Sequence, residues 1–151
     1  MIDLRVVILN YYYNPLTKGS NSLKAVLPAI LNSCSFLKEK YTQSLENINL
    51  TSLNFGPNHI WLKFEDGKAV DPYKALPSIF EDWAPEKLDG IISGLSNISD
   101  GGGALTAYSK LQFVDMSTHE RDTITTSLLK YCELDTLAMV MIYEHLLNIS
   151  A

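Results

Sequence analysis

The chain has 151 residues and a mass of 16.9 kDa, with 46% hydrophobic and 19% charged residues. This length and mix suffice for one domain and exclude wholesale disorder, because the chain can bury enough apolar surface to fold. Twelve basic and seventeen acidic residues give a net charge of −5, which argues against a nucleic-acid-binding module that relies on a strongly basic surface. We therefore expect a single domain over residues 1–151.

The gross features predict a cytoplasmic protein without a membrane partner. No stretch reaches the roughly 20 apolar residues that a membrane-spanning helix needs. Asp3 and Arg5 interrupt the apolar amino end, which lacks the basic lead-in of a signal peptide. Cys34 and Cys132 lie far apart and outside any CxxC motif, so reduced thiols are expected.

The amino-terminal part contains one ambiguous element and one clear helix. Residues 2–13 are rich in Val, Ile, Leu and Tyr and fit either a strand or a short helix, because periodicity cannot decide at this length. A helix is expected to begin at Ser22, with Ser20 or Asn21 as its cap. Pro28 lies inside the apolar pattern of that helix and predicts a kink or an early end.

The middle of the chain predicts short elements. A second amphipathic helix is expected over residues 36–45. Residues 59–64 alternate enough for a strand, and Asp66-Gly67 predicts a hairpin turn before a return strand over residues 68–71. A short helix is expected over residues 76–83, where Pro77 can occupy the first turn.

The last third of the chain has the clearest helical signals. Residues 85–100 have no strong period and predict a surface connection to a helix over residues 104–114. Ser117 and Glu120 then have the spacing of a capping box. From there to Ile149 the sequence has no Gly or Pro, which predicts one long helix or two helices with a bend.

On this last segment, Tyr131 and Asp135 are spaced i and i+4, so both lie on one helix face that Leu128, Ala138 and Ile142 make apolar. A carboxylate on an apolar face is costly unless something compensates it, and a metal ion is one such partner. The alternative is an Asp at the helix margin that is hydrated, salt-bridged or capping a neighbouring loop. The spacing alone favours this alternative, because YxxxD is frequent by chance.

Four segments together resemble a known family. Residues 131–139 resemble the third motif of DEDD-type exonucleases of the ribonuclease H-like (DnaQ-like) superfamily, in the form that carries a Tyr. The wider resemblance is to an uncharacterised bacterial family whose C-terminal domain is similar to such an exonuclease. That family has segments like residues 18–28, 71–77 and 100–108, in the same order as in this chain. The resemblance implies an α/β fold (α+β in isolation), namely the helix-rich C-terminal portion of a ribonuclease H-like exonuclease, with a small β-hairpin near 59–71.

The resemblance also implies a chemistry. In such exonucleases four acidic residues bind two divalent metals, Mg²⁺ or Mn²⁺, which polarise the scissile phosphate, activate water and stabilise the leaving oxygen. By position, Asp135 would be a metal ligand and catalytic residue, and Tyr131 would orient the attacking water. The first two acidic motifs have no match here, where Asp3 is the only acidic residue near the amino end. We therefore expect a fragment of a metal-dependent 3′-5′ exonuclease-like domain, inactive alone, that takes Mg²⁺ or Mn²⁺ only when the missing acidic motifs are supplied.

The expected partners are single-stranded nucleic acid and either a chain that carries the missing N-terminal half or a second copy of this chain. Lys18, Ser20 and Lys24 lie in the only modest basic cluster near the tyrosines at 11–13, and they are the expected nucleic-acid contact. Solvated lysines around a loop fit the same pattern equally well. The competing functional class is a non-catalytic interaction or scaffold domain. Cys132 is expected to be a small buried thiol.

Overall fold

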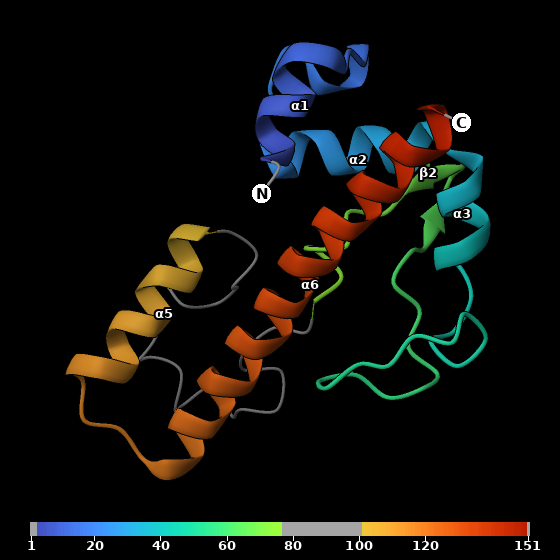
Figure 1. Cartoon of the computed structure of the whole chain (residues 1–151). Helices are drawn as coiled ribbons and strands as arrows, with labels where there is room; N and C mark the ends of the chain where they lie inside the picture. The colour runs from blue at the N-terminus through green and yellow to red at the C-terminus, as the bar shows by residue number, and fades with distance from the viewer. Residues whose placement is uncertain (1–2, 77–100, 151) are drawn as a thin grey trace. The chain divides into compact units, whose positions relative to one another are not determined.

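The computed structural model describes residues 3–76 and 101–150, which form helices and one small antiparallel sheet (Figure 1). The elements in chain order are α1 (Leu4–Tyr11), the 3-10 helix η1 (Pro15–Thr17), α2 (Leu23–Ser33), α3 (Ser35–Tyr41), β1 (Phe64–Glu65), β2 (Lys68–Ala69), α5 (Gly101–Phe113) and α6 (Thr118–Ser150). This content confirms a helix-rich mixed class. The helix expected at 76–83, apart from its first residue, and the connection at 85–100 lie outside the described residues.

The chain divides into two compact units. One comprises Met1–Pro72 together with Asp135–Ala151, and the other comprises Tyr73–Leu134. The expectation of one domain over the whole chain stays a prediction.

In the first unit, α1 decides the ambiguity of the amino-terminal segment in favour of a helix. The Asp3 side chain caps this helix, since its Oδ1 accepts a hydrogen bond from the Arg5 backbone N–H at 2.9 Å. Ile8 is the buried residue of the helix, and the chain turns to an extended conformation at Tyr12. A helix of 8 residues is marginal by itself, so the cap and the burial of Ile8 are what hold it.

The second helix, α2, begins directly after Ser22, and Pro28 does not end it. The helix continues to Ser33 because it buries five apolar side chains, and their burial outweighs the one backbone hydrogen bond that a proline removes. These side chains are Val26, Leu27, Ala29, Ile30 and Leu31. Of the two alternatives, the early end of this helix is therefore wrong, and the kink stays a prediction.

The hairpin turn is confirmed, but its strands are shorter than expected. Asp66 and Gly67 have φ values of +49° and +75°, as a two-residue type I′ turn requires, and Glu65 pairs with Lys68. The strand expected over residues 59–64 is wrong for most of its length. Trp61 and Leu62 are both buried although they are adjacent, which breaks the alternation of a strand.

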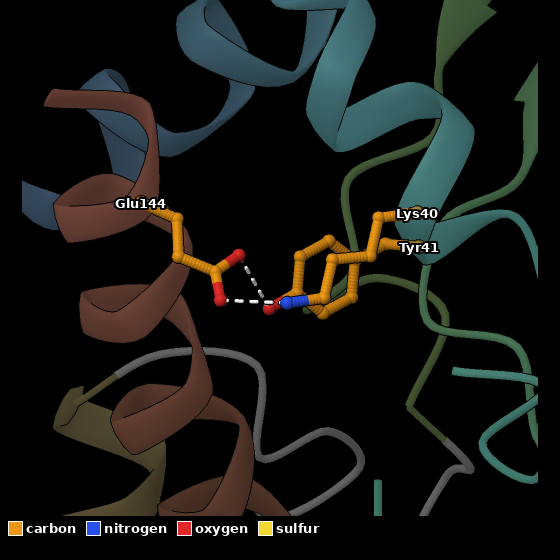
Figure 2. Close-up of polar contacts among 3 residues, drawn as sticks. All are labelled: Lys40, Tyr41 and Glu144. Carbon is orange, nitrogen blue, oxygen red and sulfur yellow. Dashed lines mark hydrogen bonds and ion pairs between the residues drawn. The ribbon is translucent and has the colours of Figure 1, made fainter. Parts of the chain in front are cut away.

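A polar link joins α3 to the last turns of α6 within the first unit (Figure 2). The Glu144 carboxylate accepts a hydrogen bond from Lys40 Nζ at 2.7 Å through Oε1 and one from the Tyr41 hydroxyl at 3.1 Å through Oε2. Burial, and then the charge of Glu144, raise the pKa of the Tyr41 phenol well above its usual range. Tyr41 therefore stays a neutral donor, and Glu144 is its acceptor.

In the second unit, the capping box predicted at the start of the long helix is confirmed. Ser117 N–H donates to the Glu120 carboxylate at 2.6 Å, and Glu120 N–H donates to Ser117 Oγ at 3.3 Å. Helix α6 then runs for 33 residues as a single element, so the alternative of two helices does not occur. Arg121 Nη1 donates to the Leu111 carbonyl at 2.9 Å and so ties α6 to α5.

We predict that Glu144→Ala destabilises the protein by about 1–3 kcal/mol, because it leaves the buried Tyr41 hydroxyl without its acceptor. Tyr41→Phe in the Glu144→Ala background should cost less than Tyr41→Phe in the wild type, since the hydroxyl then has no bond to lose. Urea unfolding of the four proteins measures this coupling. Glu39→Ala, at an exposed position on α3, is the control and should change stability little. Additive costs for the two substitutions would contradict the link.

Candidate functional site

Tyr131 and Asp135 lie one turn apart on the continuous helix α6. The Tyr131 side chain is buried, and its ring packs against Tyr73 with the ring centroids 5.9 Å apart. Asp135 is half-buried, and its helix neighbours Leu134 and Ala138 are fully buried. The helix therefore presents this carboxylate at the boundary between apolar surroundings and solvent.

Acidic residues do not gather into a metal site in the described part of the chain. Over residues 3–76 and 101–150, no three His, Cys, Asp or Glu side chains are grouped so that they can hold a metal ion. Asp3, the acid nearest the amino end, is exposed and caps α1. Asp135 is thus the one residue to which the resemblance assigns a metal.

The expected nucleic-acid contacts lie on one turn and at the start of α2. Lys18 follows η1 in the left-handed conformation, with φ of +52°, and its side chain is exposed. Ser20 is exposed, and its Oγ accepts a hydrogen bond from the Ser22 N–H at 3.3 Å. Lys24 is half-buried in the first turn of α2. Within seven residues this segment contains two lysines and two serine hydroxyl groups.

The neighbouring tyrosines divide between surface and packing. Tyr11 and Tyr13 are each 85% exposed, so their rings are accessible to a stacking partner. The Tyr12 ring instead meets the His145 ring edge-on, with the centroids 5.5 Å apart. Of the three rings, the half-buried Tyr12 ring is thus the one that contacts another side chain through its face or edge in the described part of the chain.

Sequence reasoning missed two buried polar groups in the first unit. His145 is only 6% exposed, and its Nδ1 has no hydrogen-bond partner among the described residues. His145 lies three residues after Ile142 and four after Met141, so it shares a helix face with these two buried side chains. This spacing was the sequence signal that could have predicted its burial. The indole N–H of Trp61 is likewise buried without a hydrogen-bond acceptor in the described part of the chain.

The expectation of a buried Cys132 thiol is wrong, because this side chain is exposed. Cys132 follows the buried Tyr131 directly, but successive side chains point about 100° apart around a helix. Its neighbours one turn away, Thr136 and Leu129, are also exposed, so this face of α6 points to solvent.

An apolar stripe remains exposed on the carboxyl-terminal half of α6. Its side chains are 41–51% exposed and recur at helical spacing: Met139, Val140, Tyr143 and Leu147. Such a stripe on a protein surface marks a candidate contact for another macromolecule. A helix with both the length and the apolar character to cross a membrane does not occur in the described part of the chain.

No family model, curated protein or solved structure matches the chain. The relationship to DEDD-type exonucleases therefore rests on the four sequence segments alone and stays a prediction.

We predict that stability falls as the pH drops below about 6.5, because burial lowers the pKa of His145 from its usual value of 6.5. As the pH falls, His145 takes up a proton in the unfolded chain before it does so in the folded chain. Protonation therefore stabilises the unfolded state first. The contribution of neutral His145 to stability is fully present at pH values above its pKa in the unfolded chain. It is lost progressively as the pH falls toward the lower pKa that His145 has in the folded chain. Urea unfolding between about pH 7 and pH 5 measures the decline.

His145→Leu should make the decline in stability over this range shallower. His119→Gln, at an exposed position in the first turn of α6, should leave the decline as it is in the wild type. Equal slopes for His145→Leu and the wild type would show that His145 is not the responsible group.

Proposed function

We propose that the chain is a fragment of a metal-dependent 3′-5′ exonuclease-like domain that hydrolyses nucleic-acid phosphodiesters. Asp135 is its metal ligand, and Tyr131 orients the attacking water. The observation that carries the proposal is the half-buried carboxylate of Asp135, one helical turn after the buried Tyr131 and beside the buried Leu134 and Ala138. Carboxylate oxygens are the ligands that Mg²⁺ and Mn²⁺ prefer, and the order of the four sequence segments supports the same chemistry.

The proposed chemistry needs more ligands than Asp135 provides. Mg²⁺ and Mn²⁺ prefer six oxygen ligands, of which one carboxylate supplies at most two. A pair of metals that clamps the attacking and leaving oxygens requires further carboxylates. In exonucleases of this type they come from the first two acidic motifs, which have no match in this sequence. The chain is therefore inactive by itself, and it acts with a chain or segment that supplies those acids.

Single-stranded nucleic acid is the proposed substrate. With a net charge of −5, the chain as a whole repels a phosphate backbone, so contact has to be local. A cationic segment follows the exposed rings of Tyr11 and Tyr13 closely in the sequence. It contains Lys18, Ser20 and Lys24. Lysines for the phosphates and aromatic rings for the bases are the groups that bind single strands.

A second candidate function is a non-catalytic interaction domain. The exposed apolar stripe of Met139, Val140, Tyr143 and Leu147 favours it, because a macromolecular partner would cover such a stripe. The two candidates differ in one property: a scaffold binds no metal at Asp135 even when acidic motifs are supplied.

We predict that the chain alone degrades neither single-stranded DNA nor single-stranded RNA in the presence of Mn²⁺. Co-expressed with a polypeptide that carries a strand with Asp-x-Glu and the second acidic motif, it should gain Mn²⁺-dependent degradation. Asp135→Asn should lower that activity by roughly 100-fold or more, since loss of a metal ligand removes several kcal/mol of transition-state stabilisation. Release of labelled mononucleotides measures the activity, and calorimetric titration measures Mn²⁺ binding.

Asp122→Asn is the matched control, because it removes an exposed carboxylate from the same helix. It should leave both Mn²⁺ binding and degradation unchanged. Degradation by the chain alone that Asp135→Asn abolishes would refute the claim of an incomplete site. A complemented assembly that binds no Mn²⁺ would reject the nuclease proposal and favour the scaffold.

A further inference from the structure

The unit formed by residues 1–72 and 135–151 contains a cavity of about 490 Å³ that the nuclease proposal does not use. Its walls come from α1, from the start of α2 and from the carboxyl-terminal half of α6. Cavities of this size are typical of sites that enclose a small organic molecule.

The interior of the cavity is aliphatic. Ile8, Val26 and Ile142, one from each helix, line it and are at most 5% exposed, while Met139 lines it from a half-exposed position. None of the described lining residues is aromatic, so the cavity offers no ring on which a nucleobase would stack. The lining therefore suits an aliphatic body rather than a base.

Polar groups line the same cavity from exposed or half-exposed positions, and they favour an anion. Arg5 is exposed, and its guanidinium forms no ion pair with any described residue. Asn21 and Ser22 add an amide and a hydroxyl. The Ser22 Oγ makes no capping hydrogen bond to α2 but accepts one from the Ser20 hydroxyl at 3.2 Å. Asp3, the one carboxylate among the described lining residues, already accepts the Arg5 backbone N–H. Among the described lining residues, the Arg5 guanidinium, the Asn21 amide and the remaining proton of the Ser22 hydroxyl can thus donate to a ligand, and the positive end of the α2 dipole lies at the same place.

We propose that this cavity binds a small aliphatic carboxylate, with its hydrocarbon body against Ile8, Val26 and Ile142 and its carboxylate against Arg5. Burial of the body supplies most of the affinity, and the charged hydrogen bond to Arg5 selects the anion. This binding is independent of the proposed metal chemistry at Asp135.

The test is calorimetric titration of the full chain with decanoate, decanol and adenosine monophosphate, each below the concentration at which it self-associates. Decanoate should bind about tenfold more tightly than decanol, because only the carboxylate gains the charged hydrogen bond. Arg5→Gln should remove that tenfold preference and leave decanol binding unchanged. Met139→Trp, a bulky side chain at a half-exposed lining position, should block both aliphatic ligands.

Leu147→Trp is the matched control, since it adds the same side chain to a half-exposed position of α6 that does not line the cavity. It should bind decanoate as the wild type does. Circular dichroism and the unfolding midpoint establish that each variant is folded, and Arg5→Gln, at an exposed position, keeps the test valid if Met139→Trp does not fold. Absent binding, equal affinities for decanoate and decanol, binding that survives Met139→Trp, or a preference for adenosine monophosphate would each overturn the proposal.

Discussion

The hydrogen bonds that Glu144 accepts from Lys40 and Tyr41 are the constraint on which the described unit of residues 1–72 and 135–151 depends. The Lys40 bond joins residues 104 positions apart in the sequence, and the Tyr41 bond joins residues 103 positions apart. Together they connect the end of α6 to α3. Tyr41 is almost fully buried, and Glu144 is the acceptor of its hydroxyl, so loss of this carboxylate would leave a buried donor unpaired. The link therefore fixes which face of this half of α6 turns inward, and it leaves Met139, Val140, Tyr143 and Leu147 partly exposed.

That orientation gives each face of the helix a distinct property. The inward face carries His145, whose burial without a partner for Nδ1 makes the packing sensitive to protonation. Ile142 and Met139 contribute to the wall of the cavity beside α1 and α2. Asp135, the proposed metal ligand, begins this half of the helix at a half-buried position. One amphipathic helix thus supports the packing, the cavity and the proposed metal ligand.

The features that follow from local chemistry were predictable from the sequence. The capping box of Ser117 and Glu120 depends on three residues of spacing, and the Asp66-Gly67 turn depends on backbone freedom at two positions. The absence of Gly and Pro between Ser117 and Ile149 similarly predicts a long helix. The position of Tyr131 and Asp135 one turn apart follows from that helix alone.

The features that depend on tertiary contacts were not predictable in the same way. Trp61 and Leu62 are both buried, and Leu62 donates its N–H to the Tyr41 carbonyl, a contact that no local period encodes. The exposure of Cys132 depends on which face of α6 is covered, and so does the burial of His145. The acids that would complete a metal pair have no match in this sequence, so the site could be proposed only from resemblance and not from spacing.

In the proposed function, Asp135 binds a divalent metal together with carboxylates supplied from outside this sequence. Anomalous diffraction from a Mn²⁺-soaked crystal of the complemented assembly tests it most directly. We predict a manganese peak at about 2.1 Å from a carboxylate oxygen of Asp135, with the Tyr131 hydroxyl near a metal-bound water. Manganese bound only elsewhere, with the Asp135 carboxylate in contact with protein groups alone, would contradict it.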